Sequence, residues 1–239
     1  MNNLFNQLAE HAIFVLEFAG IVILMFVIAY VVEKLSKQKD GNSERILSTK
    51  KVVIIGVFSA ISTVLMLLEF PLFFAPGDIY KMDFSELPAL LVGFAYGPVS
   101  AVMVELVKII LKTLIKGTST AFVGELANFV VGCSFLLPAT IIYRLKKTKK
   151  TAIVSCIAGT LMITAFGSFF NAVYLIPTFA GMYGIDVNTI VGMGQSVNSH
   201  ITSITSFIFM AVAPFNLLKG IIDSVITVLI YKRLRPIMK

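Results

Sequence analysis

The sequence predicts an all-α membrane protein that crosses the bilayer several times. Of its 239 residues, 57% are hydrophobic and only 14% are charged. Soluble domains have about 45–50% apolar and about 25% charged residues. Several uncharged stretches along the chain reach about 20 residues, which is the length needed to span the hydrocarbon core of a membrane.

The apolar stretches predict seven crossings, at 12–32, 52–68, 87–96, 99–115, 122–143, 152–176 and 207–231. The pair Gly97-Pro98 divides the third from the fourth, because these residues disfavour one continuous helix. The third stretch covers only about half a bilayer at 1.5 Å per residue. A short helix at membrane depth is tolerated where protein or a cavity shields it, so 83–97 is a candidate binding region.

Basic residues predict the orientation of the chain. They concentrate at 34–51, 144–150 and 232–239, and the positive-inside rule places these segments in the cytoplasm. The N-terminus is then outside and the C-terminus is cytoplasmic. Three loops are expected on the outer face, at 71–83, 116–121 and 177–202. The stretch 12–32 lacks a basic leader and a small-residue cleavage site, so we interpret it as a retained helix.

The last apolar stretch carries a polar face that predicts a ligand site. Asn216, Lys219 and Asp223 recur at spacings of three and four residues, so they share one side of a helix. A lysine amid hydrocarbon is costly and normally faces a cavity or a partner. Asparagine offers a donor beside an acceptor, which matches the edge of an imide or lactam, and lysine adds a donor for a ring carbonyl. This pattern favours a receptor for a neutral heterocycle.

Other predicted helices also contain polar side chains. Asn171 lies in the stretch 152–176, and Glu125 and Asn128 lie near the start of the stretch 122–143. They are expected to face a shared interior. The fourth stretch contains three charged residues: Glu105, Lys108 and Lys112. Their helical spacing favours structural ion pairs rather than a ligand site.

The expected outer loop at 71–83 is aromatic and rich in turn residues. It contains Phe73, Phe74 and Tyr80. Aromatic side chains beside an apolar opening suit a flat ring ligand, and an aromatic belt at the membrane interface explains the same composition equally well.

Several functions are excluded or disfavoured. The sequence has no G-x-x-x-x-G-K-[ST] motif, so it does not bind ATP through a P-loop. Cys133 and Cys156 have no metal or disulfide spacing. We expect no nucleic-acid binding, because no soluble domain presents a basic patch. Uphill transport would therefore need an ion gradient or another subunit.

Four motifs in order resemble one family of transporter subunits. They are D-F-S-E-L-P-A-L-L-V-G-F-A-Y-G-P at 83–98, V-E-L-V-K at 104–108, G-E-L-A-N-F at 124–129 and P-F-N-L-L-K-G at 214–220. The region 51–235 resembles the riboflavin-binding S components of energy-coupling factor (ECF) transporters.

The resemblance implies a six-helix receptor in the cell membrane that captures riboflavin at the outer face and is not an enzyme. A transmembrane coupling protein and two ATPases would drive uptake, so ATP is used by the partners and the chain has no cofactor of its own. Asn171, Asn216 and Lys219 would hold the flavin ring, and the 71–83 loop would close over it. The full predicted ligand set is Asp83, Phe84, Glu125, Asn128, Asn171, Asn216, Lys219 and Asp223.

The sequence departs from the family pattern at its beginning. Residues 1–50 form an extra transmembrane helix and a basic linker, and residues 51–239 form the six-helix substrate-binding domain. The family's small-residue docking motif is represented here only by Gly56 and Ala60, which allow close helix contact. We expect the coupling protein to dock there.

Two other functions are alternatives. A stand-alone proton-coupled transporter would use Lys219 and Asp223 as its coupling pair, although no convincing inverted repeat is present. A membrane enzyme acting on lipid or isoprenoid is disfavoured, because no catalytic constellation is evident.

Overall fold

The computed structural model is a helical bundle with one two-stranded ribbon, and it describes residues 12–39, 41, 45–76, 79–120 and 122–234. The first half contains α2 (Ala12–Lys39), α3 (Thr49–Leu67), β1 (Phe70–Pro71), β2 (Lys81–Met82), α4 (Glu86–Tyr96) and α5 (Pro98–Lys116). The second half contains α6 (Val123–Leu145), α7 (Lys149–Phe170), η1 (Asn171–Leu175), α8 (Ile176–Tyr183), α9 (Val187–Val197), α10 (Ile204–Phe207), η2 (Ile208–Val212) and α11 (Ala213–Leu234). The all-α membrane architecture is thus confirmed.

Five helical stretches in the described part of the chain are long and apolar enough to cross a membrane: Ile13–Lys39, Thr49–Leu67, Val123–Leu145, Lys149–Tyr183 and Ile204–Tyr231. The short helix predicted before Gly97 is present as the 11-residue α4. Helix α5 has 19 residues, but several of them are charged. The count of seven crossings therefore stays a prediction.

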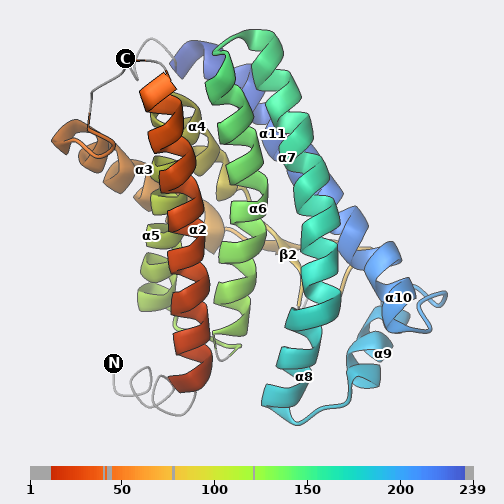
Figure 1. The fold of residues 1–239 in the computed structure, drawn as a ribbon. Helices are drawn as coiled ribbons and strands as arrows, with labels where there is room; N and C mark the ends of the chain where they lie inside the picture. The colour runs from red at the N-terminus through yellow and green to blue at the C-terminus, as the bar shows by residue number, and fades with distance from the viewer. Residues whose placement is uncertain (1–11, 40, 42–44, 77–78, 121, 235–239) are drawn as a thin grey trace.

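Basic segments gather at one end of the bundle. The end of α2, the turn between α6 and α7 and the end of α11 lie together at the top of Figure 1. This is the arrangement that the positive-inside rule requires. Residues 1–11 and 235–239, which include both chain ends, lie outside the described residues, so the predicted sidedness of the termini stays a prediction.

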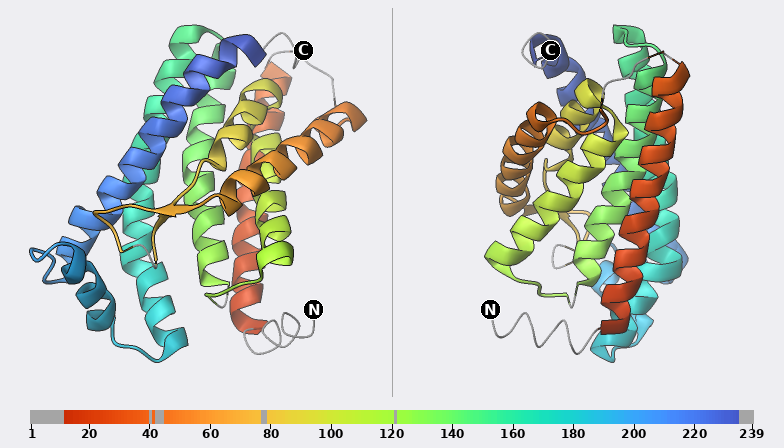
Figure 2. Two further views of the ribbon diagram at one scale, coloured as in Figure 1. Left: turned by 180° about the vertical axis from the view of Figure 1, so that it is seen from behind. Right: turned by 60° about the vertical axis from the view of Figure 1, so that its left-hand side comes forward.

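The segment between α3 and α4 enters the bundle instead of forming a surface loop. Figures 1 and 2 show the β1–β2 ribbon at mid-height, between α3 and α11. Ala75, Tyr80 and Met82 are buried and belong to a core cluster with Phe207 and Phe215. The expected outer loop at 71–83, which we call the plug segment, is therefore internal at Ala75, Tyr80, Met82 and Asp83, whereas Phe73 is 91% exposed.

The predicted loop at 177–202 is wrong for most of its length. The helix continues beyond Pro177 to Tyr183, and α9 follows at Val187–Val197. Pro177 lies inside the continuous helix Lys149–Tyr183, and the π-helical turn η1 precedes it. The same order recurs before Pro214, where η2 ends at Val212.

Helix α2 packs along α5 and α6 on the outside of the bundle (Figure 2). Phe14 and Ala29 are buried in that contact. The rings of Phe18 and Phe129 have centroids 6.1 Å apart. The opposite face of α2 is exposed and apolar, as expected of a helix that faces lipid.

We predict that Gly97→Ala destabilises the protein by more than about 1 kcal/mol, because Gly97 has φ +107° and no room for a side chain. A Cβ there would lie 2.6 Å from Glu33 Oε2 and 2.8 Å from Arg144 Nη1. Thermal unfolding of the detergent-solubilised protein measures the loss. Gly20→Ala in α2 is the control, since nothing lies within 4 Å of its added Cβ. Equal melting temperatures for the two variants would contradict the prediction.

Candidate ligand-binding cavity

A cavity of about 330 Å³ lies inside the bundle. Residues between Glu69 and Glu86 line one side of it, and helices α5, α6, α7, α8 and α11 line the rest. Its volume is at the lower end of the range for small-molecule sites. The deep polar lining consists of Asp83, Glu86, Asn128, Asn171, Asn216 and Lys219. Its apolar lining includes Tyr80, Val131, Ile163, Ile176, Phe179 and Phe215. Further polar residues also line it: Glu69, Lys81, Lys112, Lys116, Thr118, Ser119 and Thr120. The cavity thus combines aromatic and aliphatic walls with many polar side chains.

Five of the predicted ligand residues line this cavity: Asp83, Asn128, Asn171, Asn216 and Lys219. Phe84, Glu125 and Asp223 are not part of its lining. The ligand roles of these three stay predictions without support from the cavity. The structure therefore brings together three predicted amides, Asn128, Asn171 and Asn216, with Lys219 and Asp83.

Glu125 organises the turn before α6. Its carboxylate accepts hydrogen bonds from Lys112 Nζ at 2.9 Å and from the hydroxyls of Thr118 at 2.9 Å and Thr120 at 3.3 Å. A carboxylate with three donors has little need of a ligand. Lys112 therefore pairs with a residue of another helix and not within α5 as its spacing suggested, and it also lines the cavity.

The Asn216 amide is an unused donor on the cavity wall. Asn216 is 4% exposed, and its Nδ2 has no hydrogen-bond partner among the described residues. Gly167 permits the close approach of α7, since a Cβ there would lie 2.9 Å from Asn216 Nδ2. A buried amide without an acceptor costs free energy. An acceptor on a bound ligand would remove that cost.

The Asn171 amide is oriented by two contacts. Its Nδ2 donates to the Gly167 carbonyl at 2.7 Å, and its Oδ1 accepts from the Tyr80 hydroxyl at 2.8 Å. Burial raises the pKa of the Tyr80 phenol above its ordinary value, so the hydroxyl remains a proton donor. Sequence reasoning noted Tyr80 only as an aromatic loop residue and missed its contact with Asn171.

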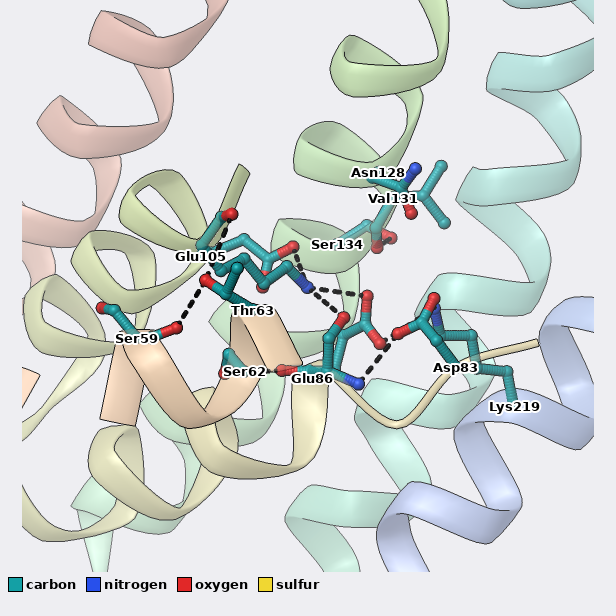
Figure 3. Close-up of polar contacts among 12 residues, drawn as sticks. Ser59, Ser62, Thr63, Asp83, Glu86, Glu105, Asn128, Val131, Ser134 and Lys219 are labelled. Carbon is teal, nitrogen blue, oxygen red and sulfur yellow. Dashed lines mark hydrogen bonds and ion pairs between the residues drawn. The ribbon is translucent and has the colours of Figure 1, made fainter. Parts of the chain in front are cut away.

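Lys219 is held by two carboxylates from the region of the short helix. Its Nζ lies 3.1 Å from Asp83 Oδ2 and 2.9 Å from Glu86 Oε2 (Figure 3). Glu86 was not selected as a site residue, although it lies within the candidate region 83–97 and lines the cavity. The alternative partner, Asp223, has neither carboxylate oxygen in a hydrogen bond among the described residues.

A second buried lysine extends this chain of charges. Lys108 Nζ lies 3.1 Å from Glu86 Oε1 and 2.8 Å from Glu105 Oε1. It also donates to Ser85 Oγ at 2.7 Å. The predicted Glu105–Lys108 pair is thus confirmed. Carboxylates and ammonium groups alternate from Glu105 to Asp83, and this charge chain links α5, α4, the plug segment and α11 across the cavity floor.

Comparisons with known proteins decide the family. The family described as "ECF transporter, substrate-specific component" matches residues 50–231. The chain belongs to this family. Its members are the substrate-specific components of membrane transporters, which agrees with the predicted class and with a function other than catalysis.

Curated relatives cover most of the ECF-family region. The riboflavin transporter RibU of Staphylococcus aureus (strain TCH60) is 35% identical over 190 residues, which are 80% of this chain and 93% of that protein. The riboflavin transporter FmnP of Bacillus subtilis (strain 168) is 32% identical over 193 residues, 80% of this chain and 94% of that protein.

A solved structure shares the fold. It is described as "Structure and mechanism of the S component of a bacterial ECF transporter", and it matches with a TM-score of 0.61 and 35% identity over 80% of this chain and 98% of that chain. Helix α2 precedes the segment that the family matches.

We predict that Lys108→Met destabilises the protein by about 3–5 kcal/mol, because it leaves Glu105 without a neutralising charge inside the bundle and leaves Glu86 with Lys219 alone. Lys116→Met is the matched control. Its pair with Glu69 is half exposed and is worth about 0–1 kcal/mol. Thermal unfolding of both variants measures the difference, and similar melting temperatures would show that the buried charge chain does not stabilise the bundle.

Proposed function

We propose that this chain is a riboflavin receptor that captures the vitamin from the outer face of the membrane. An ECF energising module, made of a transmembrane coupling protein and two ATPases, then drives uptake. The observation that carries the proposal is the cavity that brings Asn171, Asn216 and Lys219 together, with an unpaired Nδ2 on Asn216 one helical turn from Lys219. The site provides polar groups for the edge of a ring and apolar walls for its faces.

Geometry supports the choice of a flat heterocycle. Tyr80, Phe179 and Phe215 line the cavity and offer ring surfaces for stacking. Asn216 and Lys219 are on one face of α11, and Asn171 contributes from η1. An isoalloxazine ring has carbonyl and ring-nitrogen acceptors along one edge, which complement an amide donor and an ammonium donor. The relatives named as riboflavin transporters support the same ligand.

The energising partners are supported by the family and by one exposed helix face. Gly56 and Ala60 are exposed on α3, and nothing lies within 4 Å of a Cβ built at Gly56. Small residues four apart let a second helix approach closely. We place the coupling protein on this face, and we place the basic end of the bundle in the cytoplasm, next to the ATPases.

We predict that Asn216→Ala and Lys219→Ala each weaken riboflavin binding by about 1–3 kcal/mol, because each removes a polar partner of the buried ring. Flavin absorption of the purified protein, which would be yellow when loaded, and fluorescence titration of the ligand-free protein measure the affinity. Asn188→Ala and Lys150→Ala are matched controls on exposed positions of α9 and α7.

Lys219 also compensates Asp83 and Glu86, so Lys219→Ala needs a check of folding. Asn216→Ala creates no unpaired charge and tests the site by itself. Undiminished riboflavin affinity in folded Asn216→Ala would refute the assignment of the cavity. A colourless protein that fails to bind any flavin would refute the ligand.

We predict that Gly56→Leu or Ala60→Leu lowers co-purification with the energising module by about tenfold or more and leaves riboflavin binding unchanged, because a bulky side chain separates the docking helices. Ala19→Leu, on the exposed face of α2, is the control. Riboflavin uptake into vesicles that contain this chain alone, driven by a proton gradient, would instead favour a stand-alone transporter.

A further inference from the structure

Helix α2 supplies a buried carboxylate to the bundle although it lies before the family region. Glu33 is completely buried. Its Oε2 accepts a hydrogen bond from the Val99 N–H at 3.1 Å, and its Oε1 lies 3.9 Å from Arg144 Nη1. Arg144 Nε in turn donates to Ser36 Oγ of α2 at 2.9 Å. These contacts join the end of α2 to the start of α5 and the end of α6.

A helix that only anchors the chain in lipid does not need a buried carboxylate such as Glu33. An apolar contact along α5 and α6 would hold α2 in place, and a buried carboxylate is costly unless it is paired. The polar contacts of Glu33 all converge on the corner where α4 ends and α5 begins. This position indicates that the carboxylate stabilises the α4–α5 corner rather than α2 itself.

Helix α5 lacks a cap of its own. The N-cap residue is Gly97, which has no side chain to accept from the first N–H groups, and Pro98 follows it. The N–H groups of a first helical turn need acceptors, usually a side-chain oxygen of the N-cap residue. A negative charge at this end is also favoured by the helix dipole. The Glu33 carboxylate occupies that place from another helix.

The same corner positions the floor of the cavity. Helix α4 runs from Glu86 to the corner, and α5 runs from the corner back past Lys108. Glu86 and Lys108 are ion-paired to each other, and Glu86 holds Lys219. A shift of the corner would therefore move the charges on which Lys219 rests.

We propose that α2 caps α5 through Glu33 and thereby sets the position of the α4–α5 corner and the affinity of the cavity for its ligand. We call this arrangement the clamp. Glu33 is a positioning residue and does not touch the ligand. The effect on affinity rests on the proposed riboflavin-receptor function, whereas the capping of α5 is independent of it.

The test uses the full chain in lipid nanodiscs with the variants Glu33→Ala and Glu33→Gln. Glu17→Ala is the control, because Glu17 is the other α2 carboxylate with a partner, the Tyr174 hydroxyl at 2.7 Å, near the opposite end of the helix. Hydrogen–deuterium exchange of the peptides covering 97–104 and 83–90 is measured without ligand. Riboflavin affinity is measured separately by fluorescence titration.

Glu33→Ala is expected to speed exchange at 97–104 roughly fivefold, as for loss of an N-cap, to speed exchange at 83–90, and to weaken riboflavin binding roughly threefold or more. Glu33→Gln keeps an oxygen for the Val99 N–H and loses the charge. It should restore most of both properties, whereas a role limited to the Arg144 ion pair would make Gln as damaging as Ala. Glu17→Ala should behave as wild type.

Unchanged exchange at 97–104 in Glu33→Ala would overturn the capping of α5. Faster exchange with unchanged riboflavin affinity would overturn the effect on the cavity and leave α2 as a structural helix. If Glu33→Ala does not fold, the test rests on Glu33→Gln. Exchange at 97–104 as slow as in the wild type supports the capping of α5, and a misfolded Glu33→Gln overturns it. A wild-type protein that binds no flavin refutes the proposed function alone, because the exchange measurement still tests the clamp.

Discussion

The arrangement of this bundle depends on the buried charge chain from Glu105 to Asp83. Two lysines and three carboxylates alternate within hydrogen-bonding distance, and all are almost fully buried. Each ion would be costly alone at this depth, and removing one partner leaves another uncompensated. The chain therefore fixes α4, α5, α11 and the plug segment relative to one another. It also explains why a helix as short as α4 can begin in the middle of the bundle, since its first turn carries a charge that two lysines neutralise.

Two π-helical turns lie beside the cavity, and each precedes a proline. Each π-helical turn ends two residues before a proline, at Pro177 and at Pro214. A proline within a helix removes a hydrogen bond and its ring clashes with the preceding turn, and π turns are frequent at functional sites. Asn171 begins the first π turn, and Asn216 follows the second by one turn. The two π turns thus lie beside Asn171 and Asn216, two of the asparagines that line the cavity.

The site residues that the sequence predicts correctly are those that lie on a single helix. Asn216 and Lys219 follow from helical spacing and from the cost of a charge in an apolar stretch. The partner of Lys219 does not, because Asp83 lies 136 residues away in the chain and helical spacing favours the nearer Asp223. The Tyr80–Asn171 contact was missed for the same reason, with 91 residues between its members. The prediction that the helix ends near Pro177 was also wrong, because a π turn lets the helix continue past this residue.

Helix α2 shows how a segment that precedes the family region contributes to the corner between α4 and α5. The Gly97-Pro98 corner is tight, because φ at Gly97 is +107° and a Cβ there would collide with Glu33 and Arg144. A residue with its own capping side chain is therefore excluded at this position, and α5 must obtain its acceptor elsewhere. In this chain α2 provides it, at the corner that joins the two helices bearing Glu86 and Lys108. The constraint at Gly97 and the carboxylate of Glu33 thus belong to one contact between α2 and the α4–α5 corner.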